Sequence, residues 1–180
     1  MIRSILAFIL FTATLVGISL AQDKPFPAFP LDFTGHWKGT LHWYPLGKPS
    51  KTVEMQLIIQ PLDTPGCYQW QMVYGSPGQD NRGYTLKSVD STSGHWVVDE
   101  NNGILLDGYW LGGRFTSIFS VQGSVITEVL WLENGALQIE FITHSEKAVR
   151  ESGGTDANIP AARSYPVRGY QRATLHRIKK

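Results

Sequence analysis

Residues 104–144 read ILLDGYWLGGRFTSIFSVQGSVITEVLWLENGALQIEFITH, four segments in which apolar and polar residues alternate. The segments are separated by Gly112-Gly113, Gln122-Gly123 and Asn134-Gly135, and Asn102-Gly103 stands just before the first. Such pairs supply the positive φ angles that tight β-hairpins need. Neighbouring segments are therefore expected to be adjacent antiparallel strands.

The same alternation continues on both sides of this stretch, with almost no helical pattern between the segments. Ten strands are expected, at residues 35–44, 51–60, 67–75, 82–89, 95–99, 104–111, 114–121, 124–132, 136–144 and 168–177. The first and last strands can pair across a seam, which closes the sheet and leaves no free edge. The sequence thus predicts an all-β fold, a closed antiparallel up-and-down barrel of about ten strands.

The phase of the alternation predicts which side chains face the barrel interior. Residues 53, 55, 57 and 59 are apolar while their neighbours are mostly polar, which is typical of a sheet with one solvated face. The same rule turns many aromatic side chains inward, in a chain with six Trp, seven Tyr and eight Phe. Aromatic walls suit a pocket for a flat or greasy ligand, although small barrels also fill their interior with large side chains.

The first 21 residues have the pattern of a cleaved signal peptide. Arg3 precedes an apolar run over residues 5–20, and Ser19-Leu20-Ala21 supplies small residues for cleavage. An uncleaved membrane anchor is the alternative, because the apolar run is almost long enough to span a bilayer. With residues 1–21 as a signal peptide, the protein is expected to be secreted or periplasmic.

The mature chain is expected to consist of an arm and one domain. Residues 22–32 are a proline-rich lead that cannot be helical and is expected to lie along the barrel as an extended arm. Residues 33–180 form the single barrel domain. Cys67 is the only cysteine, so packing alone has to stabilise this domain, without an internal disulfide.

The charge balance limits the partners. The chain has 16 Lys and Arg against 15 Asp and Glu, and loss of Arg3 with the signal peptide leaves no net charge. The basic residues are scattered except for Lys179-Lys180, whereas a nucleic-acid-binding face needs a basic surplus. The expected partner is a small apolar or aromatic molecule, with no nucleic acid and no stable membrane insertion after signal cleavage.

Gly35-His36-Trp37, preceded by Phe33, resembles the Gly-x-Trp motif on the first strand of the calycin superfamily, the lipocalins and fatty-acid-binding proteins. The resemblance implies a ligand-holding barrel in which a late basic residue packs over that Trp. Arg177 has the inward phase, and an antiparallel seam brings it beside Trp37. We therefore expect a structural cation–π pair between Trp37 and Arg177.

Two departures from these families limit what the resemblance carries over. The chain lacks the helical pair that follows the first strand in fatty-acid-binding proteins. Tyr170-Gln171-Arg172 reverses the order of their carboxylate-binding Arg-x-Tyr motif. A fatty-acid clamp is therefore not expected here.

The five histidines are the candidate metal or haem ligands. His36 and His42 are roughly 20 Å apart along one strand, and His36 with His176 lacks a third ligand, so no metal site is expected. Ten-strand barrels of the nitrobindin type hold haem through a His on the last strand, which makes His176 a low-ranking haem alternative. The alternation along the last strand turns the His176 side chain outward, so no cofactor is expected.

Catalytic motifs do not stand out, so an enzyme is left open but not favoured. Glu128 and Glu140 lie on consecutive strands, where they resemble the paired carboxylates of a glycosidase. Their strand phase assigns both to the solvated outer face.

The function favoured by the sequence is an exported barrel that encloses a small apolar or aromatic ligand. Arg82 shares the phase of Tyr84 and Leu86 at a strand end, which makes it the candidate polar anchor. The alternative is a barrel packed solid with side chains, acting as a protein-interaction or envelope-structural module. An inner cavity of a few hundred Å³ distinguishes the two. The candidate ligand-binding residues are Trp43, Trp70, Tyr74, Arg82, Phe119 and Phe141.

The segment from Ser145 to Val167 is long and poor in strand signals, as lids and mobile surface loops are. It joins two neighbouring strands and therefore starts from one mouth of the barrel. It is expected to fold over the open mouth, opposite Trp37.

Overall fold

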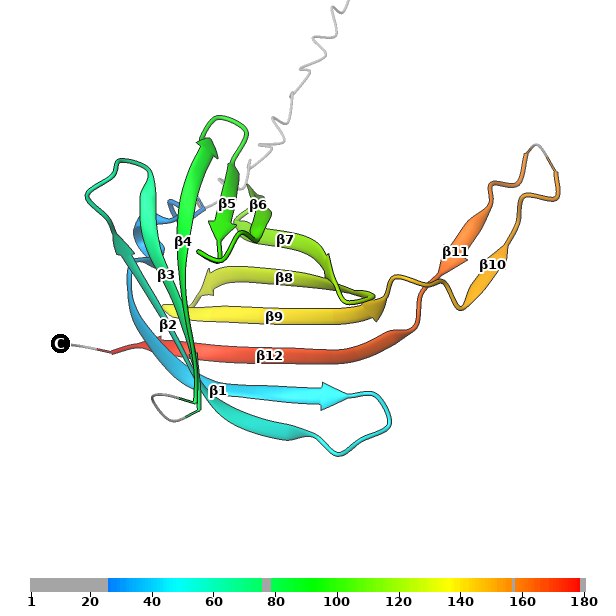
Figure 1. The fold of residues 1–180 in the computed structure, drawn as a ribbon, viewed down its shortest axis with the longest axis horizontal. Coiled ribbons are helices and arrows are strands. Elements are labelled where there is room, and N and C mark those ends of the chain that lie inside the picture. Colours follow the sequence, from blue (N-terminus) through cyan, green and yellow to red (C-terminus); the bar gives the residue numbers. More distant parts are fainter. Residues whose placement is uncertain (1–25, 76–78, 157, 179–180) are drawn as a thin grey trace, which may run out of the picture.

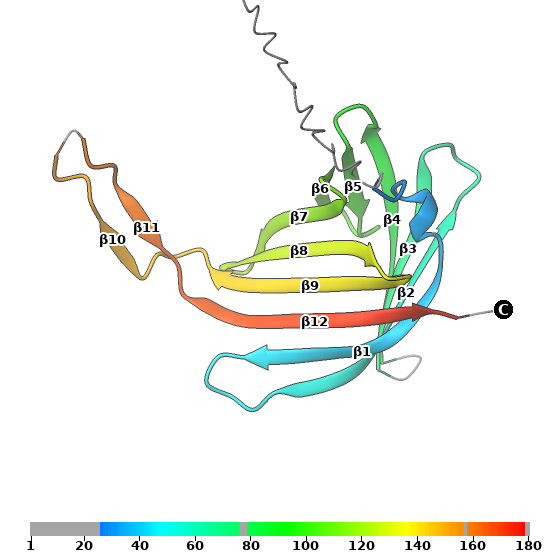
Figure 2. The same cartoon turned by 180° about the vertical axis from the view of Figure 1, so that it is seen from behind.

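The computed structural model describes residues 26–75, 79–156 and 158–178. Ten strands form a closed antiparallel barrel in the order β1-β12-β9-β8-β7-β6-β5-β4-β3-β2 (Figures 1 and 2). Apart from the β1–β12 seam and the β9–β12 pair, every strand pairs with its neighbours in the chain. The predicted all-β meander barrel is thereby confirmed. The predicted signal peptide lies outside the described residues.

The barrel strands differ from the predicted bounds by no more than a residue or two. A short 3-10 helix, η1, precedes β1, and a two-stranded hairpin is inserted before β12. Within the described residues, no helix is both long and apolar enough to cross a membrane. The elements are η1 Leu31–Phe33, β1 Gly35–Pro45, β2 Lys51–Pro61, β3 Cys67–Tyr74, β4 Asp80–Asp90, β5 His95–Asp99, β6 Leu105–Leu111, β7 Arg114–Val121, β8 Ser124–Glu133, β9 Ala136–Ser145, β10 Arg150–Ser152, β11 Ala162–Ser164 and β12 Val167–Arg177.

Three of the four predicted glycine turns have the expected backbone. Both residues of Gly112-Gly113, Gln122-Gly123 and Asn134-Gly135 have positive φ, as two-residue hairpin turns matching the strand twist require. The β5–β6 turn is wider, because Asn101 and Gly103 are the residues with positive φ there. The Glu100 amide donates to the Ile104 carbonyl at 3.0 Å and closes this turn.

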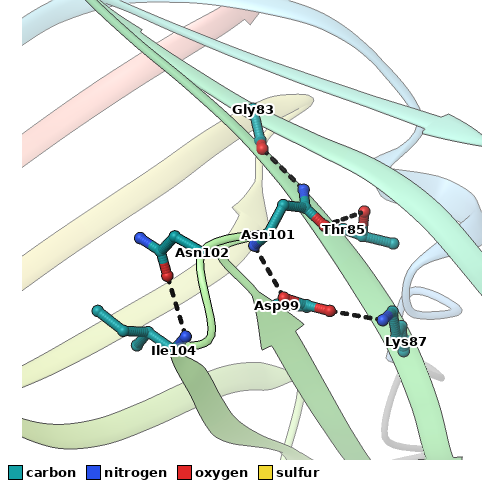
Figure 3. A network of polar contacts seen from close by, with 7 residues as sticks. All are labelled: Gly83, Thr85, Lys87, Asp99, Asn101, Asn102 and Ile104. Atoms are coloured by element: carbon teal, nitrogen blue, oxygen red, sulfur yellow. Dashed lines mark hydrogen bonds and ion pairs between the residues drawn. The ribbon is translucent and has the colours of Figure 1, made fainter.

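A polar network fixes the β5–β6 turn against β4 (Figure 3). The Asp99 carboxylate accepts from Lys87 Nζ at 2.6 Å and from the Asn101 amide at 2.8 Å. Asn101 Nδ2 donates to the Gly83 carbonyl at 2.9 Å, and the Ile104 amide donates to Asn102 Oδ1 at 2.9 Å. Glu100 is thereby held at a defined position between β5 and β6.

The seam pairs Trp37 directly with Arg177 and continues to Pro45 opposite Gly169. The guanidinium carbon of Arg177 lies 4.5 Å from the centroid of the Trp37 ring, so the expected cation–π contact is present. Arg177 Nη2 also donates to the Asp32 carbonyl at 2.8 Å, and Trp37 Nε1 donates to the Phe33 carbonyl at 2.7 Å. One end of the barrel is therefore tied to η1.

Aromatic side chains fill this closed end. Phe29 stacks on Phe115 with ring centroids 4.7 Å apart and on Trp110 at 5.1 Å, and it meets Trp96 edge-on at 5.4 Å. Phe33 is fully buried beside it. The described part of the proline-rich arm thus turns into the end of the barrel instead of running along its outer face, because burial of the two Phe rings is favourable.

The late segment forms its own hairpin, which projects away from the ends of β9 and β12 (Figures 1 and 2). β10 and β11 pair from Arg150 opposite Ser164 to Ser152 opposite Ala162, and Arg163 Nε lies 2.9 Å from Glu151 Oε1. All six of these strand residues are exposed. The segment leaves from the predicted end of the barrel, but the prediction that it folds over the mouth is wrong, because its polar strands pair with each other.

Candidate functional site

The half of the barrel opposite Trp37 is hollow. Its cavity has a volume of about 600 Å³, above the few hundred Å³ that distinguish a container from a packed module. The other half is solid, since Phe33, Trp37, Leu57 and Ile59 fill it. All six predicted ligand-binding residues line the cavity: Trp43, Trp70, Tyr74, Arg82, Phe119 and Phe141.

Strand alternation positions this lining. Trp70, Met72 and Tyr74 follow one another at every second position of β3 and all face the cavity, as Ser117 and Phe119 do on β7. Because the strands are antiparallel, the C-terminal half of β3 lies beside the N-terminal half of β4. The side chains therefore gather at one end of the barrel although they are far apart in the sequence.

The tryptophans mark the depth of the cavity. Trp70 is only 1% exposed and its ring lies 5.8 Å from that of Phe115 in the closed half, so it forms part of the floor. Trp43 is 41% exposed and lies at the rim, with Lys51 Nζ 5.6 Å from its ring centroid. The apolar lining of the cavity therefore extends from the rim at Trp43 to the floor at Trp70.

Arg82 lines the cavity as predicted, but its guanidinium is already paired. Its Nε and Nη2 donate to the two carboxylate oxygens of Asp80 at 2.9 and 2.7 Å, and its Cζ lies 5.1 Å from the centroid of the Tyr74 ring. The Asp80 carboxylate raises the pKa of Arg82, and the Arg82 guanidinium lowers the pKa of Asp80. This bidentate pair leaves Arg82 less free to anchor a ligand than the sequence suggested.

Glu128 faces the cavity, contrary to its predicted position on the outer face. It lies on β8 between Ser117 of β7 and Phe141 of β9, both of which line the cavity, and it faces inward with them. Its side chain is buried, at 7% exposure, and Oε1 has no hydrogen-bond partner among the described residues. Burial raises the pKa of Glu128 to about 7.

The assignment of Glu128 to the outer face is therefore wrong, and its physical reason is the composition of β8. Val125 and Val129 make the outer face of this strand as apolar as the inner one, so hydrophobicity alone did not fix its phase. The available signal was the shared phase of Glu128 with Ile126 and Leu130. Glu140 does lie outside the barrel, where its Oε1 accepts from the Tyr170 hydroxyl at 2.5 Å.

The nearby hydroxyl groups do not bind Glu128. Ser117 Oγ donates to the Asp107 carbonyl at 2.7 Å, and the Tyr74 hydroxyl donates to Met72 Sδ at 3.5 Å. Burial and the Glu128 charge both raise the pKa of Tyr74, so its hydroxyl stays protonated at neutral pH. The cavity thus combines aromatic walls, an ion pair between Arg82 and Asp80 and one inner carboxyl without a donor.

The histidines lie outside this cavity. His176 is exposed on the outer face of β12, and His36 Nε2 lies 2.7 Å from Gln56 Oε1 on the outer face of β1 and β2. Across the described ranges, no group of three or more His, Cys, Asp or Glu residues is arranged to hold a metal ion. His42 and His176 border a second, mostly polar pocket over β1, β8, β9 and β12.

No protein-family model matches the chain, and no curated protein does. Solved structures with a similar fold include a protein of unknown function from the DUF3598 family of Nostoc punctiforme, with a TM-score of 0.61 and 16% identity over 86% of this chain and 51% of that chain. The S-type phycobiliprotein lyase CPES of Guillardia theta has a TM-score of 0.55 and 9% identity over 83% and 90% of the two chains.

This chain therefore spans about half the length of the Nostoc protein and most of the Guillardia one. Identities at this level show the fold alone. The fold is a calycin-like ten-strand barrel, as Gly35-His36-Trp37 predicted.

Proposed function

We propose that this protein is an exported, lipocalin-like binding protein that encloses a small apolar or aromatic molecule in the open half of its barrel. The observation that carries the proposal is the cavity of about 600 Å³ lined by Trp43, Trp70, Phe119 and Phe141. A cavity of this size accommodates a ligand of several fused or linked rings.

In this proposal, the affinity comes from burial of apolar ligand surface against the cavity lining. Each Å² of apolar ligand surface removed from water contributes roughly 25 cal/mol before the costs of ordering the ligand are subtracted. The floor at Trp70 and the closed-end plug around Phe29 stop the ligand from passing through the barrel. Ligand enters and leaves at the open end, where the β1–β2, β3–β4, β5–β6, β7–β8 and β9–β12 connections lie.

The solid closed half supports stability and not an interaction role. Phe29 meets Phe33 edge-on, and Phe33 and Trp37 belong to the buried core cluster, so a barrel packed only for stability would continue this packing to the other end. The open half instead leaves a lined space. This contrast favours the container over the packed interaction module.

Export is part of the proposal and rests on the pattern of residues 1–21. The chain without this segment should appear outside the cytoplasm when the full sequence is expressed in a bacterium. A mature product that begins at Gln22 supports cleavage. Retention of the intact chain in the inner membrane overturns this part of the proposal and supports the anchor.

Binding is tested with N-phenylnaphthylamine, a neutral apolar dye that fluoresces when it leaves water. Thr143→Trp places a large ring in the cavity, whereas Ile142→Trp places the same ring on the exposed outer face of β9. We expect saturable binding to the wild type and to Ile142→Trp, and binding at least tenfold weaker to Thr143→Trp. Equal binding to both variants, or none to the wild type, overturns the proposal.

A further inference from the structure

A purely apolar ligand would leave the buried carboxyl of Glu128 without a partner. The Glu128 side chain is buried and lines the cavity, and its Oε1 finds no hydrogen-bond partner in residues 26–75, 79–156 and 158–178. A buried carboxyl without a donor is costly, and almost all buried polar groups in folded proteins have a partner. The missing partner points to a molecule inside the cavity.

The other charged groups of the cavity already have partners. Arg82 and Asp80 bind each other, and Lys51 lies over the Trp43 ring at the rim. Glu100 Oε2 accepts from Asn102 Nδ2 at 3.1 Å. Of the described side chains that line the cavity, Glu128 is the ionisable group that is both buried and unpaired.

The groups around Glu128 do not supply a positive charge. Its neighbours on the adjacent strands are Ser117, whose hydroxyl is used elsewhere, and Phe141. The remaining ionisable groups that face the cavity are Lys51, Tyr74, Asp80, Arg82, Tyr84 and Glu100. Burial is the cause of the raised pKa of Glu128, with no cation opposing it.

We propose that the ligand is an apolar or aromatic amine whose ammonium group pairs with the carboxylate of Glu128 inside the barrel. The inference rests on the proposed function and specifies its ligand class. An ionised carboxylate only accepts hydrogen bonds, and an ammonium supplies both the donor and the opposite charge. The face of Trp70 also attracts cations, so this part of the wall favours the same ligand.

Anionic ligands fit this cavity poorly. A carboxylate that reaches the inner half meets the negative charge of Glu128, while the guanidinium of Arg82 is bound by both oxygens of Asp80. The cavity should therefore distinguish head groups on the same aromatic body, with the amine bound most tightly.

Because Glu128 gains a proton on acidification, the affinity for an amine should depend on pH. The carboxyl is mostly ionised at about pH 8 and mostly protonated at about pH 6, because burial raises its pKa to about 7. An alkyl ammonium keeps its charge over this range. Amine binding should weaken on acidification, by up to about tenfold, while binding of a neutral analogue should hardly change.

The test uses three probes with one aromatic body, naphthylethylamine, naphthylethanol and naphthylacetate, titrated into the protein by calorimetry at about pH 8 and about pH 6. The variants are Glu128→Gln, which keeps the shape of the side chain, and Glu133→Gln, an exposed position on the same strand. A thermal melt of each variant verifies that it is folded.

We expect the amine to bind the wild type and Glu133→Gln about tenfold or more tightly than the alcohol at pH 8. Glu128→Gln should lose this preference and its pH dependence while still binding the alcohol. Equal affinities for the three probes, tightest binding of the acid, or an amine preference that survives Glu128→Gln overturns the inference and leaves the container intact. No binding of any probe overturns the inference and the proposed function together.

Discussion

Arg177 lies directly opposite Trp37 across the β1–β12 seam, with its guanidinium carbon 4.5 Å from the centroid of the indole ring. The same guanidinium donates to the Asp32 carbonyl at 2.8 Å. One side chain thus links the last strand, the first strand and η1. The contact closes the barrel at the end farthest from the cavity.

Arg177→Ala should lower the free energy of unfolding by about 1 to 2 kcal/mol, because a cation–π contact and a hydrogen bond are lost. Urea unfolding followed by fluorescence measures the change. Arg172→Ala, an exposed residue on the outer face of β12, is the control and should cost less than about 0.5 kcal/mol. Equal losses in the two variants would show that the Trp37 contact contributes nothing.

Phe29→Ala should destabilise the barrel by about 2 to 4 kcal/mol, because the ring packs between Phe115, Trp110 and Trp96. Phe26→Ala is the matched control, since that ring is 64% exposed. Thermal or denaturant unfolding gives both values. If the two changes cost the same, the arm does not plug the closed end.

The stability of the protein should fall as pH rises from about 4.5 to about 7. Burial raises the pKa of Glu128 from 4.5 to about 7, so in this window the folded state binds more protons than the unfolded state. The contribution of Glu128 to the free energy of unfolding is fully present below about pH 4.5 and is lost as pH rises through about 7. The total change over this window is at most about 3 kcal/mol.

Glu128→Gln isolates this effect, because the amide does not titrate. The difference in unfolding free energy between the variant and the wild type should grow with pH in favour of the variant, measured without ligand from about pH 5 to about pH 8. A difference that stays constant over this range would mean that Glu128 is not buried in its ionised form.

Replacing residues 151–163 by a short Gly-Ser bridge should change neither stability nor ligand release. The β10–β11 hairpin is exposed and points away from the barrel, and none of its described residues lines the cavity. Stopped-flow displacement of N-phenylnaphthylamine measures release. Faster release after the deletion would restore the lid interpretation that the sequence favoured.

The barrel was predictable because two signals, turn residues and apolar alternation, agreed along much of the chain. Glycine pairs such as Gly112-Gly113 predicted the hairpins, and the alternation of apolar and mostly polar residues, as in residues 53–59, predicted the inner face. The same phase identified the aromatic lining, including Trp70 and Phe119. Each of these predictions needed only local sequence and the period of a strand.

The polar chemistry of the cavity was not predictable in the same way. β8 is apolar on both faces, so Glu128 was assigned outward, and Asp80 was placed before the start of its strand and not beside Arg82. The first error concerns the phase of a single strand, and the second concerns where β4 begins, because Asp80 and Arg82 lie two residues apart on that strand. The plug at Phe29 was missed because a proline-rich sequence fixes backbone conformation but not where the backbone docks.

The central claim, that a ligand occupies the open half of the barrel, is tested most directly by the indole N–H signals of the six tryptophans in NMR spectra. On titration with naphthylethanol, the account predicts saturable shifts for Trp43 and Trp70, which line the cavity. Shifts confined to the tryptophans outside the cavity, or no saturable shift at all, would contradict the account. The four tryptophans expected to stay unchanged are Trp37, Trp96, Trp110 and Trp131.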